Sequence, residues 1–145
     1  MTQKDKRYLQ DKLHHERDKE LLLKDICARL PYNPMVEYKK ETYNVLGIAH
    51  GRLVLCKPFM SNTLGECPLV EEVKPYLLPM SSMTEEQKKE LADILIEMQL
   101  KAISDVINGE DVAAYEIDFY NRHHIDYRGL IPKGIAIDAT GLGIY

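Results

Sequence analysis

The first thirty residues combine a charged half with an apolar half, and both fit one helix. Residues 2–20 mix charges of both signs densely, a pattern typical of a solvated helix whose start frays. Pro31 ends the helix, because the residue before a proline avoids the α region. The apolar residues of the second half recur at spacings of three and four, which places them on one helical face: Leu22, Leu23, Ile26, Cys27 and Leu30.

Residues 35–80 change to short β-prone runs separated by turns. His50-Gly51 fits a hairpin turn between two of these runs. The prolines of this region lack a ladder donor and belong at edges, bulges or strand ends. The pattern predicts a small twisted antiparallel sheet, or a half-barrel, of about four or five strands. The expected strands cover Met35–Tyr38, Thr42–His50, Arg52–Phe59, Leu64–Cys67 and Val70–Leu77.

A second helix is predicted from residue 84 to about residue 107. Thr84-Glu85-Glu86-Gln87 has the form of a capping box, in which Thr84 and Gln87 exchange side-chain and backbone hydrogen bonds. Two neighbouring apolar stripes give this helix an apolar arc of about 240°. Such an arc exceeds what one sheet covers, so the helix is either central or packs on another subunit. The stripes are Leu91, Ile94, Leu95, Met98 and Ala102, and beside them Ile96, Leu100, Ile103 and Ile107.

A third helix and an extended tail complete the chain. Asn108-Gly109 predicts an αL cap, and Glu110 and Asp111 place acid at the positive end of the next helix. Residues 129–145 have no helical rhythm, and their apolar end is expected to dock in the same subunit or in another. We therefore expect one α+β domain over residues 1–145. Its segments are a charged helix (1–20), helix plus sheet (21–83), a helical pair (84–124) and a tail (125–145).

Composition narrows the function classes. The chain has 145 residues, of which 45% are hydrophobic and 29% charged, with a formal net charge of −4. That acidic balance disfavours broad nucleic-acid binding, which needs a cationic surface. No apolar run approaches the roughly 18–20 residues that cross a bilayer, and no signal peptide is seen. Cys27, Cys56 and Cys67 are odd in number and widely spaced, which favours reduced thiols in a cytoplasmic protein without membrane contact.

The densest gathering of chemical groups follows the third helix. Guanidinium groups fork onto phosphate oxygens, and a tyrosine ring can stack on a base. The segment therefore predicts a site for a small phosphorylated or nucleotide ligand. The opposing interpretation is a surface turn in which the arginines pair with nearby acids, the histidines complement the helix dipole and Asp126 caps the turn. The candidate ligand-binding residues are Arg122, His123, His124, Asp126, Tyr127, Arg128 and Lys133.

Two other function classes stay open. His123, His124 and Asp126, joined by His50 or Asp118, could form the metal centre of a nucleotide or phosphoester hydrolase, although their spacing matches no zinc signature. A nucleic-acid-associated module could also be built on the small sheet. No catalytic motif and no cofactor motif is found in the sequence. A non-catalytic binding protein is therefore expected, and the wide apolar arc of the second helix favours a homo-oligomer, most simply a dimer.

Three stretches resemble uncharacterised small proteins encoded by gut Bacteroidetes and by their phages or prophages. They are Leu21–Tyr32, Lys74–Gln87 and His123–Gly134, of which the last is the most specific. The likeness spans most of the chain after residue 20, and the middle strands match only in pattern. The resemblance implies an accessory protein of mobile elements that acts by binding. Such a protein would block a host protein or sequester a nucleotide signal, as in inhibition of host defence.

Overall fold

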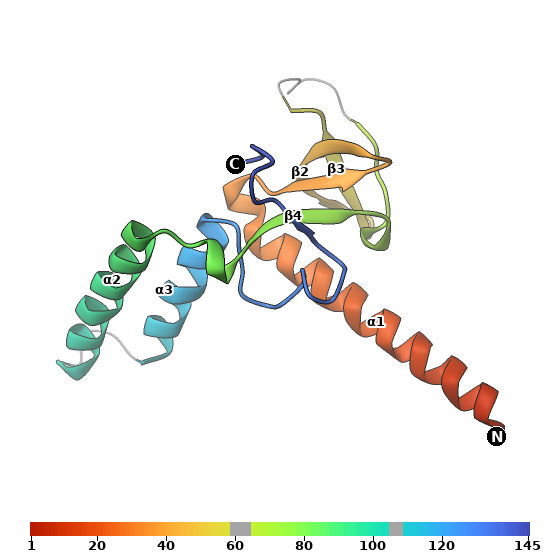
Figure 1. The fold of residues 1–145 in the computed structure, drawn as a ribbon, viewed down its shortest axis with the longest axis horizontal. Coiled ribbons are helices and arrows are strands. Elements are labelled where there is room, and N and C mark those ends of the chain that lie inside the picture. Colours follow the sequence, from red (N-terminus) through yellow and green to blue (C-terminus); the bar gives the residue numbers. More distant parts are fainter. Residues whose placement is uncertain (59–64, 105–108) are drawn as a thin grey trace.

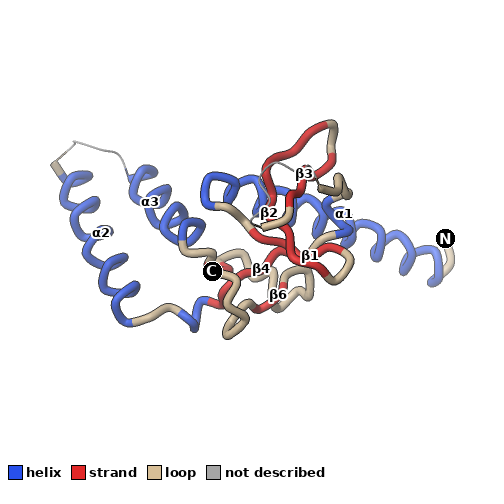
Figure 2. The backbone as a smooth tube through the Cα atoms, turned by 90° about the horizontal axis from the view of Figure 1, so that it is seen from above, coloured by secondary structure: helices blue, strands red, loops and turns tan. Residues whose placement is uncertain are grey.

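The computed structural model describes residues 1–58, 65–104 and 109–145 and confirms the predicted α+β fold. The long helix α1 (Gln3–Arg29) packs its second half against the sheet, while its first half projects away from the rest of the molecule (Figure 1). Helices α2 (Glu85–Ile103) and α3 (Gly109–Arg122) lie side by side at the opposite end. Figure 2 shows the same arrangement from above.

Helix α1 begins with a capping box that the sequence analysis missed. The Asp5 amide donates to the Thr2 hydroxyl (3.1 Å), and the Asp5 carboxylate accepts from the Thr2 amide (3.0 Å). Two orphan donors of the first turn are thus satisfied. The helix start therefore has a stabilising cap, and fraying of this end stays a prediction. At the other end, Pro31 lies in a 3-10 turn formed by Leu30–Tyr32.

The sheet is mixed rather than purely antiparallel. Its first four strands pair antiparallel, as predicted, and the structure gives their order as β3-β2-β1-β4. The two shortest strands, β5 and β6, both pair parallel with β4. The strands are β1 (Met35–Tyr38), β2 (Glu41–Ala49), β3 (Arg52–Cys56), β4 (Lys74–Pro79), β5 (Ile125–Asp126) and β6 (Ile137–Asp138).

Two predicted strands differ from the structure. The run expected over Val70–Leu77 starts as a strand only at Lys74, because Val70–Glu72 forms a 3-10 turn. Residues 65–67 are not a strand, yet Gly65 and Glu66 exchange backbone hydrogen bonds with Leu55 of β3. Residues 59 and 64, the end and the start of two predicted strands, lie outside the described residues.

The hydrophobic core forms two clusters. The larger lies between α1 and the sheet and includes Ile26, Val36, Leu55 and Leu77, each at most 1% exposed. The smaller lies where α2 and α3 meet the end of the sheet and contains Met83, Leu91, Phe119 and Ile125. The segment that follows α3 joins the two clusters.

Helix α2 starts as predicted and then departs from the prediction. The Thr84–Gln87 capping box is present, with hydrogen bonds of 3.0 and 3.1 Å. Of its large apolar residues only Leu91 is fully buried, so the helix is not central. The stripe formed by Ile96, Leu100 and Ile103 is exposed by 56%, 62% and 80%. The helix ends at Ile103 with Ser104 as its C-cap, and Gly109 of the predicted cap is the first residue of α3. Residues 105–108 lie outside the described residues.

The C-terminal tail docks within its own chain. The Ala139 amide donates to the Leu77 carbonyl (2.8 Å) beside β6. The Tyr145 hydroxyl accepts from the Met35 amide and donates to the Tyr76 carbonyl, both at 3.0 Å. The last residue thereby bridges β1 and β4. Among the helices of the described residues, none is both long and apolar enough to pass through a membrane.

Candidate ligand-binding site

A buried ion pair on α1 is the centre on which the C-terminal segment converges. The Arg29 guanidinium donates Nε to Asp25 Oδ2 (3.0 Å) and Nη2 to Asp25 Oδ1 (3.1 Å). The two residues are 1% and 0% exposed. They stand four apart on the helix, which puts both on the face that packs against the sheet.

Arg29 also ties α1 to the segment that follows α3. Its Nη2 donates to the Ile125 carbonyl at 2.7 Å, and its Nη1 donates to the Tyr120 carbonyl at 3.5 Å. All three guanidinium nitrogens therefore have acceptors. A buried charge is tolerated only when it is paired and hydrogen-bonded, and Arg29 meets both conditions.

Arg128 brings a second guanidinium to the same carboxylate. Its Nη1 lies 3.7 Å from Asp25 Oδ1, close enough for an ion pair but too far for a hydrogen bond. The Arg128 side chain is 15% exposed, and its Nη1 is a buried atom without a hydrogen-bond partner. Two guanidinium groups thus face one carboxylate, which leaves a surplus positive charge at this place.

Tyr127 lies against both arginines. The guanidinium carbons of Arg29 and Arg128 are 5.5 and 4.8 Å from the centre of its ring, within cation–π range. Its ring stacks on that of Tyr120 at 5.6 Å and 26°. The Tyr127 hydroxyl is buried and has no hydrogen-bond partner. The predicted stacking tyrosine is therefore already stacked, and its hydroxyl is the group left for a ligand.

His124 lies two residues after the end of α3 and has a left-handed backbone conformation, with φ 59°. Glycine or asparagine is usual there, because a larger side chain costs roughly 1–2 kcal/mol. The ring stacks on Tyr145 with centroids 3.5 Å apart and 9° between planes. Burial, then the charge of Arg29 and then His123, lower the pKa of His124 to about 4. His124 is thus neutral at pH 7 and does not add the positive charge expected at the helix end.

His123 and Asn121 add two further unpaired polar atoms. The His123 ring lies 4.4 Å from the Phe119 ring, and its Nε2 is buried without a hydrogen-bond partner. Asn121 is 5% exposed, and its Oδ1 is likewise unpaired. The sequence analysis did not select Asn121, because a polar residue in an amphipathic helix is most simply solvated.

The remaining predicted site residues do not point to a ligand. Both oxygens of the Asp126 carboxylate accept backbone amides, from Leu130 and Ile131, each at 2.9 Å. This geometry matches the turn-capping interpretation of Asp126. Arg122 is exposed, with its guanidinium 5.7 Å from the Phe119 ring centre, and Lys133 is exposed.

The alternative metal centre is not assembled. In the part of the chain that the structure describes, no three or more His, Cys, Asp and Glu side chains are grouped to hold a metal ion. His50 is exposed in the turn between β2 and β3, with a positive φ. Asp118 accepts a hydrogen bond from the Tyr32 hydroxyl. Neither side chain supplies the third ligand that the hypothesis requires.

The site therefore brings together residues that the sequence analysis found and others that it missed. His123, His124, Tyr127 and Arg128 were predicted, whereas Asp25, Arg29, Asn121 and Tyr145 were not. Asp25 and Arg29 could have been found, because they interrupt the apolar face of α1 at helical spacing. Comparison of the chain with protein-family models, with curated proteins and with solved structures gives no match.

Proposed function

We propose that the protein is a non-catalytic binding protein that holds a small anionic ligand, phosphorylated or carboxylate-bearing, beside Arg128. One observation carries the proposal. Six buried side-chain atoms of the described residues lack a hydrogen-bond partner, and five of them come from one short segment. They belong to Asn121, His123, His124, Tyr127 and Arg128, while the sixth belongs to Asn44. Buried polar groups are normally paired, so such a concentration points to an absent hydrogen-bonding partner.

Two of the unpaired atoms favour an anion: the Arg128 nitrogen can only donate, and the Tyr127 hydroxyl donates readily. The unpaired Asn121 oxygen only accepts, so it would need a donor group of the ligand. The nearby Asp25 carboxylate is already neutralised by Arg29, which leaves the charge of Arg128 in surplus. A phosphate or carboxylate would supply acceptors for Arg128 and Tyr127 and the missing negative charge. Charge-assisted hydrogen bonds of this kind are roughly twice as strong as neutral ones.

Binding is favoured over hydrolysis by the state of Asp126. A hydrolase centred on His123, His124 and Asp126 needs that carboxylate as a ligand or base. Both of its oxygens instead accept backbone amides of the following turn. A cytoplasmic location belongs to the same proposal. Binding of a host protein and an anti-defence role rest on the resemblance alone.

The predicted dimer has one specific support. Ile96, Leu100 and Ile103 form an exposed apolar stripe along α2. Contiguous exposed apolar surface is typical of interaction sites. The tail is not free for such a contact, because Tyr145 binds its own chain. Sedimentation of the wild type and of Leu100→Glu tests this part: a dimer that dissociates in the variant supports it, and a wild-type monomer refutes it.

The anion is tested by thermal unfolding at constant ionic strength. Pyrophosphate, inorganic phosphate and citrate are compared with chloride. At 100 times its dissociation constant, a ligand stabilises by about 2.7 kcal/mol, or roughly 5–10 °C in a chain of this size. The shift should disappear in Arg128→Gln and persist in Arg122→Gln, a matched exposed arginine. If each anion acts as chloride does, or if Arg128→Gln responds like wild type, the proposal is wrong.

A further inference from the structure

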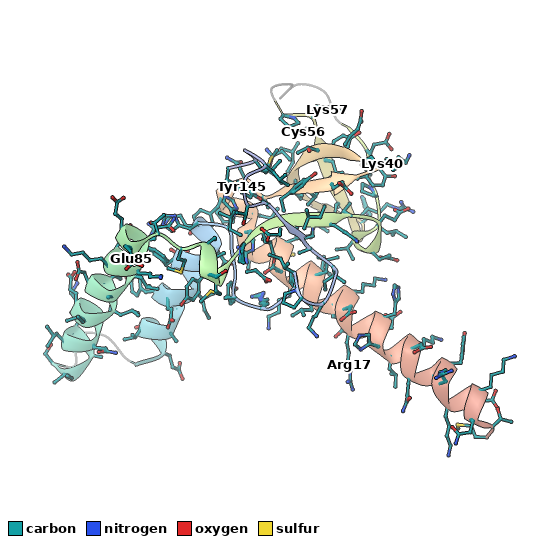
Figure 3. All side chains as sticks on the ribbon, in the orientation of Figure 1. Arg17, Lys40, Cys56, Lys57, Glu85 and Tyr145 are labelled. Carbon is teal, nitrogen blue, oxygen red and sulfur yellow. The ribbon has the colours of Figure 1, made fainter. Side chains whose placement is uncertain are left out.

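The first half of α1 is not covered by any other element among the described residues. Residues 1–17 are all exposed. Figure 3 shows their side chains, Arg17 among them, reaching into open space around the projecting helix. An isolated helix shorter than about 15 residues is marginal in water, because most helix stability comes from packing. This half of α1 is continuous with the packed second half, and its exposed surface is available to another molecule.

An exposed stripe along α1 shows where that surface would lie. The residues recur at spacings of four, three, four, three and four, which is the core pattern of a coiled coil. Leu9, Leu13 and Leu23 are 44%, 58% and 37% exposed, and Cys27 is also exposed. The stripe lies about 150° around the helix from the buried face of α1. Its members are Leu9, Leu13, Glu16, Glu20, Leu23 and Cys27, all exposed.

The charges beside the stripe indicate the charge of the partner. At the flanking positions of the heptads stand Lys12, Arg17, Lys19 and Lys24, and no acidic residue occupies a flank between residues 9 and 27. Lys19 also lies 3.9 Å from the Glu71 carboxylate of its own chain, so the other three carry most of the charge offered to a partner. Such positions form the salt bridges that choose partner and orientation. From this we infer that the stripe docks an acidic amphipathic helix of another protein. That helix would carry acids on its flanks and basic residues opposite Glu16 and Glu20.

A second copy of this chain fits poorly in either orientation. In a parallel pair Lys12 and Lys19 of one chain would face Arg17 and Lys24 of the other. In an antiparallel pair each basic flank of one chain would face the same basic flank of the other chain. Both arrangements also bring Glu16 and Glu20 together in the core, and like charges at an interface are unfavourable. An anionic membrane is disfavoured too, because the two glutamates interrupt the apolar stripe.

The test uses the full chain and two synthetic three-heptad helical peptides. The acidic probe has leucine at the core positions, lysine at the two central ones and glutamate at every flank. The basic probe is identical except for lysine at the flanks. Fluorescence anisotropy should show the acidic probe binding about tenfold more tightly, with affinity that falls as salt screens the flanks. Helix content by circular dichroism should rise on binding.

Variants separate the stripe from the rest of the helix. Leu9→Ser combined with Leu13→Ser should weaken binding of the acidic probe about tenfold, because two exposed anchors are lost. Tyr8→Ser is the matched control, since Tyr8 is 67% exposed but stands off the stripe. Equal binding of both probes overturns the inference. The inference is also wrong if the wild type self-associates, or binds phosphatidylserine vesicles, and the double variant does not. The result is independent of the proposed anion site, because Arg128 contacts α1 at Asp25 and Arg128→Gln changes no residue of the stripe.

Discussion

The substitution Asp25→Asn tests the buried charges directly. The Asp25 carboxylate accepts two hydrogen bonds from Arg29, at 3.0 and 3.1 Å, and lies 3.7 Å from a nitrogen of Arg128. Asparagine has nearly the same shape but carries no charge. Two guanidinium groups would then share a buried place without a counter-charge. Removing one partner of a buried ion pair destabilises by about 3–5 kcal/mol, and we expect a loss in that range.

A loss of this size is a large part of the stability of the molecule. Domains unfold with a free energy of about 5–15 kcal/mol, so the variant should sit close to its unfolding midpoint under mild conditions. Urea unfolding followed by far-ultraviolet circular dichroism and tyrosine fluorescence measures it, since the chain has nine tyrosines and no tryptophan. The dependence of the unfolding free energy on urea should stay unchanged if both proteins expose the same surface.

Asp11→Asn provides the matched control on the same helix. Asp11 stands two heptads before Asp25 and is fully exposed, so its replacement should change stability by no more than about 0.5 kcal/mol. Added phosphate should stabilise Asp25→Asn more than wild type, because the anion then replaces the lost carboxylate. Equal losses for the two variants would refute the argument that Asp25 neutralises buried cations.

Three further predictions concern the tail, the end of α3 and the sheet. Tyr145→Phe removes a hydroxyl that makes two hydrogen bonds, so urea unfolding should show a loss of about 1–2 kcal/mol. The pKa of His124 is about 4 in the folded protein and 6.5 in the unfolded chain. The free energy of unfolding is therefore highest above pH 6.5 and decreases as pH falls toward 4. That loss is on the order of 3 kcal/mol, and His124→Asn, which keeps the backbone conformation, should flatten it in acid unfolding curves. Gly65→Ala places a carbon 2.9 Å from a backbone oxygen of β3, so thermal unfolding should show a loss of stability of about 1–3 kcal/mol. Gly47→Ala is the control, because its added carbon meets no atom within 4 Å and should not cause that loss.

Local signals predicted those parts of the fold that local physics determines. The capping box at Thr84 and Gln87 needs only four consecutive residues, and the structure contains it. The His50-Gly51 turn needs two residues that accept a positive φ, and both have one, at 52° and 74°. In each case neighbouring residues satisfy one another, so the sequence pattern is sufficient.

Pairings between distant segments could not be predicted in the same way. Strands β5 and β6 have two residues each, too few to show alternation, and their parallel pairing with β4 depends on long connections. The contacts of Asp25 and Arg29 also join segments that are distant in the sequence. The Arg29 hydrogen bond to Ile125 joins residues 96 apart in the sequence, and no local pattern predicts that contact. The sequence located one half of the site, and only the structure supplies the other half.

Three departures from ordinary structure coincide after α3 and support a functional centre there. His124 holds a left-handed backbone, Arg128 is a cation in surplus, and five buried polar atoms lack partners. A segment selected only to fasten α3 to α1 would be more stable with apolar contacts, since buried ion pairs seldom add net stability. Local rules are broken mainly where function requires it. The same segment is therefore expected to become more ordered and more stable when an anion joins Arg128, which a purely structural lock would not do.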